Sequence, residues 1–229
     1  MEWIMGGGPI MYPLLFCSVL SIAIIFERAI SLRRGKVIRS EIIEAINSIR
    51  SPEDVPLAFS KCEVIPGPFS NIVKQVLSQE HSTREEKVAE IQVTGKQETK
   101  LLERRLFVLE IIAAVSPLLG LLGTILGLNE IFGVISVKGL GETKAFSYGI
   151  SEALRTTILG LFVAIPTMAA YSYFDKKVGY LVHEMERHCT LLLNRLYSFQ
   201  SASPRAWLAG NESQNIGSQK KEKITSFRG

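Results

Sequence analysis

Three long windows without charged residues divide this chain of 229 residues. They run from about Trp3 to Phe26, from Ile111 to Asn129, and from Thr156 to Phe174. A hydrocarbon layer about 30 Å thick requires roughly 20 apolar residues per spanning helix. A single window of this kind is also typical of a buried helix in a soluble protein, but three in one chain favour membrane spans. The sequence therefore predicts an all-α membrane protein with three transmembrane helices.

The distribution of lysine and arginine predicts the orientation of these helices. Basic residues follow the first and third windows and precede the second, whereas the loop between the second and third windows holds only Lys138 and Lys144. Cytoplasmic flanks carry the excess of positive charge. The first window also lacks the basic start and small-residue cleavage site of a secretory signal, which predicts a retained anchor. We therefore expect the N-terminus outside and the C-terminus in the cytoplasm.

Helical patterns continue beyond two of the windows. From Arg84 to Ile135 no strong helix breaker occurs except Gly95 and Pro117, which predicts one helix of roughly 50 residues, about 75 Å long. The third helix is expected to continue to about Phe199, so that two extended helices and shorter ones form a cytoplasmic bundle. The expected segments are a first transmembrane helix (1–30), a cytoplasmic helical region (31–105), a second transmembrane helix (106–135), a short periplasmic loop (136–147), a third transmembrane helix (148–174), a cytoplasmic helix extension (175–200) and a disordered basic tail (201–229).

Two threonines lie deep in the second and third windows. Because the two helices run in opposite directions, Thr124 and Thr157 fall at about the same depth, roughly 15 Å below the outer loop. Polar residues at this depth are costly and frequently mark ion pathways. In the alternative interpretation, each hydroxyl bonds the carbonyl four residues earlier in its own helix.

Small side chains form a stripe along each of these two helices. They recur at steps of three and four residues, as in closely packed transmembrane helices. The stripes are open to two interpretations: packing within one chain, or a smooth wall around a partner's helix. The candidates for the wall are Ser116, Gly120, Gly123, Gly127, Ala153, Gly160 and Ala164.

No carboxylate lies at the depth of the paired threonines. Threonine does not titrate near neutral pH, so this chain alone is a poor proton relay, and if ions cross here we expect another subunit to supply a carboxylate. Glu152 lies outward of Thr157, and with Arg155 it is either a helix-stabilising pair or a gating charge. At the cytoplasmic boundary, Glu27 and Arg28 are explained by interface anchoring and snorkelling. The chain shows no metal-ligand cluster, phosphate-binding loop or nucleophile constellation, so we expect no metal, no cofactor and no enzymatic reaction.

The motifs of all three windows together resemble those of the MotA/TolQ/ExbB proton channel family. Residues 115–127 (VSPLLGLLGTILG) are similar to its second-span signature. Residues 150–154 (ISEAL), followed by Thr157, 160–161 (GL) and 164–166 (AIP), are similar to its third-span signature. Residues 7–9 (GGP), 11–13 (MYP) and the Glu27–Arg28 pair resemble the first span of ExbB in particular.

The resemblance implies a homopentamer around a central pore that encloses the single-span helices of an ExbD-like partner. In this family an intramembrane aspartate of the partner takes up the proton, and Thr124, Thr157 and Glu152 match the family's ion-pathway residues. The implied function is an ion-driven motor subunit that works on envelope partners, with TonB-type transport as the first expectation and a TolQ-like role as the alternative. Arg155 and Thr156 depart from the usual apolar or small residues, which makes them candidates for gating or specificity.

Two rival functions come from other classes of protein. One is a non-conducting scaffold that organises envelope partners. The other is a membrane enzyme or transporter with its own substrate pocket, which the lack of an acid–base cluster in the spans disfavours.

Overall fold

The computed structural model describes residues 9–78, 83–138 and 143–202. Within these ranges every regular element is helical, in agreement with the predicted all-α class. Three helices are long and apolar enough to cross a membrane, over Met11–Ser31, Leu106–Ser136 and Gly149–Ser198. The first eight residues, residues 79–82, residues 139–142 of the expected 136–147 loop and the basic tail beyond residue 202 lie outside the described residues. The chain divides into two compact units.

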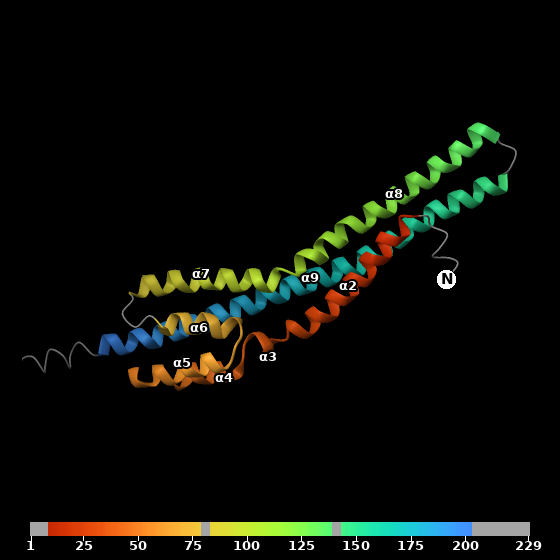
Figure 1. Cartoon of the computed structure of the whole chain (residues 1–229). Coiled ribbons are helices and arrows are strands. Elements are labelled where there is room, and N and C mark those ends of the chain that lie inside the picture. The colour runs from red at the N-terminus through yellow and green to blue at the C-terminus, as the bar shows by residue number, and fades with distance from the viewer. Residues whose placement is uncertain (1–8, 79–82, 139–142, 203–229) are drawn as a thin grey trace, which may run out of the picture. The chain divides into compact units, whose positions relative to one another are not determined.

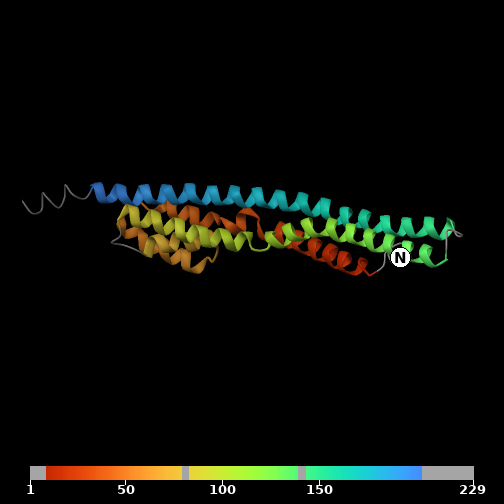
Figure 2. The ribbon, with the colours of Figure 1, turned by 90° about the horizontal axis from the view of Figure 1, so that it is seen from above.

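The first unit contains the apolar helices. Its elements are α2 (Met11–Ser31), α8 (Leu106–Lys138) and the first part of α9 (Thr143–Ala202). Figures 1 and 2 show α8 and this part of α9 running side by side, with α2 close to them. Proline lies inside both long helices, as Pro117 in α8 and Pro166 in α9. Neither proline ends its helix, which agrees with the tolerance of transmembrane helices for proline.

The second unit is built from shorter amphipathic helices and the ends of two long ones. The short helix α3 (Arg34–Val37) still belongs to the first unit. The elements of the second unit are α4 (Ser40–Ser48), the 3₁₀ turn η1 (Pro52–Asp54), α5 (Val55–Val64), α6 (Pro68–Ser78), the first part of α7 (Arg84–Glu103) and the last part of α9. Phe69 is fully buried and contacts the His188 ring, with 5.8 Å between the ring centroids. Arg195 of α9 donates to the Ile46 carbonyl at the end of α4, at 2.8 Å.

The expectation of one unbroken helix from Arg84 to Ile135 was wrong. The structure has two helices, because α7 ends at Glu103, α8 begins at Leu106, and a turn separates them. In a continuous α-helix the Leu102 carbonyl would accept the Leu106 N–H. Here Arg28 donates to that carbonyl, with 3.0 Å between Nη1 and the oxygen. A side chain from α2 therefore satisfies a carbonyl at the end of α7.

Candidate functional site: a threonine cluster between two spanning helices

Close packing of glycines brings α8 and α9 together in the first unit. A Cβ added to Gly160 of α9 would lie 2.6 Å from the Ser116 carbonyl oxygen and 3.1 Å from the Gly120 Cα. A Cβ added to Gly120 of α8 would lie 3.0 Å from the Thr157 Cα. A side chain at Gly160 would collide with the backbone of α8, and one at Gly120 would be tightly confined, so the backbones approach as closely as small-residue motifs allow. We call this contact the glycine seam.

The small-residue stripes of α8 and α9 lie against each other at several positions. Gly127 lies against Ala153, with 2.9 Å from an added Cβ to the Ala153 Cβ, and Gly123 lies against Thr156. These contacts occur within one chain, as the packing interpretation expects, and the wall around a partner's helix stays a prediction. The seven residues predicted for that wall are buried or half-buried within the chain: Ser116, Gly120, Gly123, Gly127, Ala153, Gly160 and Ala164.

Beside the glycine seam, the hydroxyls of Thr124 and Thr157 contact each other through a hydrogen bond in which either can donate. Both side chains are half-buried. The sequence placed them at one depth, and the structure joins them directly. In the alternative interpretation each hydroxyl bonds a carbonyl of its own helix, and this describes Thr124 only in part. Its oxygen is 3.3 Å from the Gly120 carbonyl in its own helix, but it is also 3.1 Å from the Ala153 carbonyl in α9.

Thr156 completes a cluster of three hydroxyls. It is 2% exposed, and its Oγ1 lies 2.7 Å from the Ala153 carbonyl and 3.2 Å from the Gly120 carbonyl. Thr157 Oγ1 lies 3.1 Å from the same Gly120 oxygen. Three hydroxyls and two backbone carbonyls thus form one hydrogen-bonded group in a stretch of otherwise apolar side chains. Such a group can receive, orient or pass a hydrogen bond, but it holds no titratable proton near neutral pH.

The two charged candidates of α9 precede the cluster along the chain. Glu152 and Arg155 are both half-buried and three residues apart on the same helix. Glu152 lies about one turn before Thr156, and Arg155 lies immediately before it. The hydroxyl cluster itself contains neither of them.

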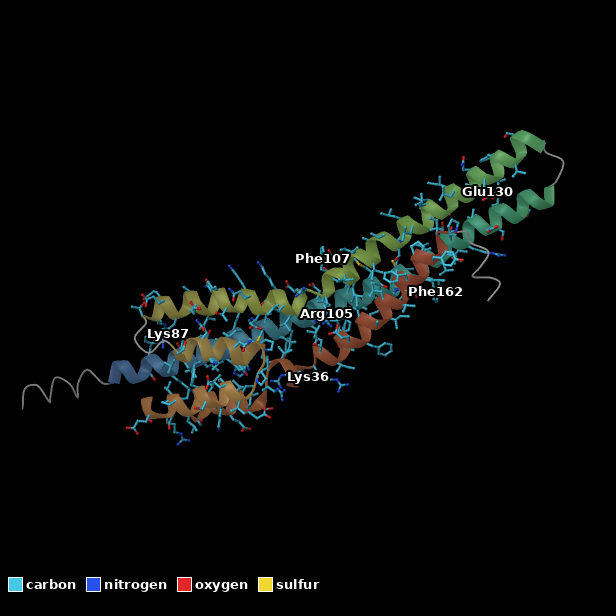
Figure 3. All side chains as sticks on the ribbon, viewed as in Figure 1. Lys36, Lys87, Arg105, Phe107, Glu130 and Phe162 are labelled. Atoms are coloured by element: carbon cyan, nitrogen blue, oxygen red, sulfur yellow. The ribbon has the colours of Figure 1, made fainter. Side chains whose placement is uncertain are left out.

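The interpretation of Arg28 as a snorkelling side chain was wrong. Its side chain is only 6% exposed, and besides the Leu102 carbonyl it contacts Glu27 at 3.2 Å. Glu27 also pairs with Arg105 at 2.6 Å, and Figure 3 shows Arg105 at the junction of α7 and α8. The Leu102 carbonyl that Arg28 contacts lies 74 residues away in the chain. A local sequence pattern does not predict such a contact.

Comparisons with known proteins show the family to which the chain belongs. The chain matches the MotA/TolQ/ExbB proton channel family over residues 65–187. It is 36% identical over 187 residues to a Synechocystis sp. protein named as biopolymer transport protein ExbB-like 3, covering 74% of this chain and 82% of that protein. It is 28% identical over 212 residues to an ExbB homologue of Methanothermobacter thermautotrophicus, covering 92% of this chain and 74% of the relative.

A solved structure shares the fold. The structure of C. jejuni MotAB superimposes with a TM-score of 0.52, covering 85% of this chain and 76% of that chain at 17% sequence identity. At this identity the likeness concerns the fold alone. The family match extends over both threonine-bearing helices, and the relative from Synechocystis sp. is matched over most of its length. The chain therefore belongs to the MotA/TolQ/ExbB proton channel family.

Proposed function

We propose that this chain is the pore-lining subunit of a proton-driven motor in an inner membrane. Five copies surround the single-span helices of an ExbD-like partner, whose intramembrane aspartate carries the proton. The observation that carries the proposal is the hydroxyl contact between Thr124 and Thr157 on two adjoining apolar helices. Proton flow past these hydroxyls moves one component against the other, and that movement does work on envelope partners.

The roles of individual residues follow from their places. Thr124 and Thr157 offer hydroxyl oxygens to the partner's acid, since hydroxyls both donate and accept. The glycine seam holds the two helices at the distance that these hydroxyls require, which is a supporting role instead of direct contact with the partner. Glu152, one turn outward of Thr156, and Arg155, next to Thr156, set the local charge where the ion enters. No bond to a substrate is made or broken, so the proposed role is not that of an enzyme.

The proposed topology keeps the expected segments. The N-terminus and the 136–147 loop lie in the periplasm, and the 31–105 and 175–200 segments and the basic tail lie in the cytoplasm. TonB-type energised transport is the first candidate for the work performed, because the Synechocystis relative carries an ExbB-like name. A TolQ-like role in envelope maintenance is the alternative, because the matched family includes TolQ.

Proton flux in liposomes tests the proposal. The complex co-purified with its single-span partner is reconstituted with a pH-sensitive dye inside and a pH gradient across the membrane. We expect Thr157→Val and Thr124→Val each to lower proton flux at least about tenfold. A tenfold lower rate corresponds to an activation free energy raised by roughly 1.4 kcal/mol. Thr167→Val is the matched control, because Thr167 is buried and its hydroxyl donates to the Val163 carbonyl of its own helix, at 2.7 Å.

Three outcomes would contradict the proposal. Full flux in both threonine variants would remove the pore assignment. Absence of flux in the wild-type complex under both pH and sodium gradients would favour the non-conducting scaffold. The third outcome concerns the mass of the co-purified complex. A mass that does not correspond to five copies with a smaller partner would refute the proposed assembly. The flux measurement would still test the ion path.

A further inference from the structure

Glu110 and Tyr171 form a second polar contact between α8 and α9, inward of the threonine cluster and toward the predicted cytoplasmic side. The hydroxyl of half-buried Tyr171 lies within hydrogen-bonding reach of the exposed Glu110 carboxylate. Glu110 precedes Thr124 in α8 by as many residues as Tyr171 follows Thr157 in α9, 14 in each case. Because the two helices are antiparallel, these equal steps keep the pair level, about 21 Å inward of the two threonines.

The two contacts also lie along the same flank of the helix pair. A step of 14 residues is just under four turns of an α-helix, and it returns a side chain to within about 40° of its starting direction. Thr124 and Thr157 meet at one end of this stretch, and Glu110 and Tyr171 meet at the other. A path that leaves the threonines along α8 and α9 toward the cytoplasmic side therefore reaches Glu110.

The stretch between the two contacts offers this path no other exposed polar side chain from α8 or α9. Among residues 111–123 and 158–170, all of which the structure describes, the only polar side chains are those of Ser116 and Thr167. Both are buried, and each hydroxyl donates at 2.7 Å to the carbonyl four residues earlier in its own helix. Glu110 is therefore the first carboxylate that these two helices present inward of the threonines.

Other acidic side chains at this end of the first unit are placed differently. Glu27 is engaged by an arginine at 2.6 Å, so an ion pair already occupies its carboxylate. Glu103 and Asp175 add negative charge near Tyr171. However, Glu103 belongs to α7, and Asp175 lies about one turn beyond Tyr171 in α9. Glu110 thus combines a place at the end of the path with a group that binds and releases protons, which the threonines lack.

We propose that Glu110 is the proton-release residue of this chain, which takes the proton from the partner's acid and passes it to the cytoplasm. This inference rests on the proposed function, since the proton arrives on that acid. The O–H bond of the partner's carboxyl group, or of a water that relays its proton, breaks, and an O–H bond to Glu110 forms. Glu110 then gives the proton to cytoplasmic water and returns to the carboxylate, so no electron is transferred. Tyr171 holds the Glu110 side chain against α9.

Two substitutions separate proton release from a structural tie to Tyr171. Glu110→Gln keeps the size of the side chain and an acceptor oxygen but does not titrate, whereas Glu110→Asp keeps the carboxylate on a shorter stem. We expect Glu110→Gln to lower proton flux at least about tenfold and Glu110→Asp to retain it within about twofold, since a positioned acid or base speeds proton transfer by roughly 10²–10⁴. A structural tie predicts the opposite order, because the amide oxygen of Glu110→Gln still accepts from Tyr171 and the shorter carboxylate reaches it less well.

The measurement uses the reconstituted complex with its partner and a pH gradient. Glu103→Gln is the matched control, because it also removes one negative charge near Tyr171 but lies outside α8 and α9. We expect this control to retain wild-type flux. Equal losses in Glu103→Gln and Glu110→Gln would assign the effect to local charge and overturn the release role.

The remaining outcomes distinguish the release role from the proposed function. Wild-type flux in Glu110→Gln, with Thr157→Val inactive, would overturn the release role and leave the proposed function intact. Flux retained in both variants would overturn the proposed function itself. If Glu110→Gln fails to assemble by mass measurement, Glu110→Asn and Glu110→Asp, which match each other in size, replace it. Loss of flux in Glu110→Asn alone would support the release role, and any other result would count against it.

Discussion

Arg28 donates to the carbonyl of Leu102 at 3.0 Å and thereby joins the last turn of α2 to the end of α7. The guanidinium is buried, and its neighbour Glu27 extends the contact to Arg105 in the turn before α8. A buried arginine that bonds a helix-terminal carbonyl satisfies one of the acceptors that every helix end leaves open. Arg28 thus caps the end of α7, next to the turn that precedes α8.

Replacing Arg28 should therefore destabilise the first unit. In Arg28→Leu the side-chain stem keeps its apolar contacts, but the Leu102 carbonyl loses its partner, at a cost of about 1–3 kcal/mol. Unfolding of the purified protein in mixed micelles, followed by circular dichroism, measures the difference. Arg33→Leu is the control, because Arg33 is exposed and its loss should change stability by less than about 0.5 kcal/mol. Equal stability of the two variants would contradict the structural role of Arg28.

A methyl group at Gly160 should separate α8 from α9. In Gly160→Ala the new Cβ would lie 2.6 Å from the Ser116 carbonyl oxygen, and a backbone atom cannot rotate away as a flexible side chain can. We expect a loss of about 1–3 kcal/mol in stability, typical of overpacking. The same unfolding measurement applies.

Gly133→Ala is the matched control for Gly160→Ala. Gly133 lies in α8, and an added Cβ there meets no atom within 4 Å. Alanine should leave stability unchanged or raise it by up to about 1 kcal/mol, because alanine has the higher helix propensity. If both alanines are equally tolerated, the helices are not held together by the glycine seam.

Cys62 should react slowly with alkylating reagents. Burial raises the pKa of its thiol from 9.0 to about 11, although nearby Lys74 acts in the opposite direction. At pH 8 the reactive thiolate is therefore scarcer than in an unfolded chain. In a Cys17→Ser, Cys189→Ser background, mass spectrometry should show slow labelling of native protein and rapid labelling after denaturation.

The same shift predicts how stability depends on alkaline pH. The folded state binds the Cys62 proton more tightly than the unfolded state, so its contribution to stability is complete below pH 9. That contribution is lost as the pH rises from 9 to about 11. Stability of Cys62→Ala should fall less steeply across this range than that of the wild type. Identical slopes would contradict the raised pKa.

Much of this protein follows from the sequence alone. The three charge-free windows predict the spanning helices, because the requirement to bury about 20 apolar residues per span is local. The spacing of Gly120, Gly123 and Gly127 predicts a closely packed face, and the helical rise predicts that Thr124 and Thr157 share one depth. These features depend only on residues close together in the chain, so their pattern is visible in the sequence.

Only the tertiary structure decided which groups meet. It directed the small-residue faces of α8 and α9 toward each other, and it brought Thr156 to the Gly120 carbonyl, 36 residues away. It also brought Arg28 to the Leu102 carbonyl at the end of α7, where the predicted single helix is interrupted by a turn before α8. A polar group away from water bonds whichever partner the packing brings within about 3 Å. That choice depends on residues distant in the chain, and no local periodicity encodes it.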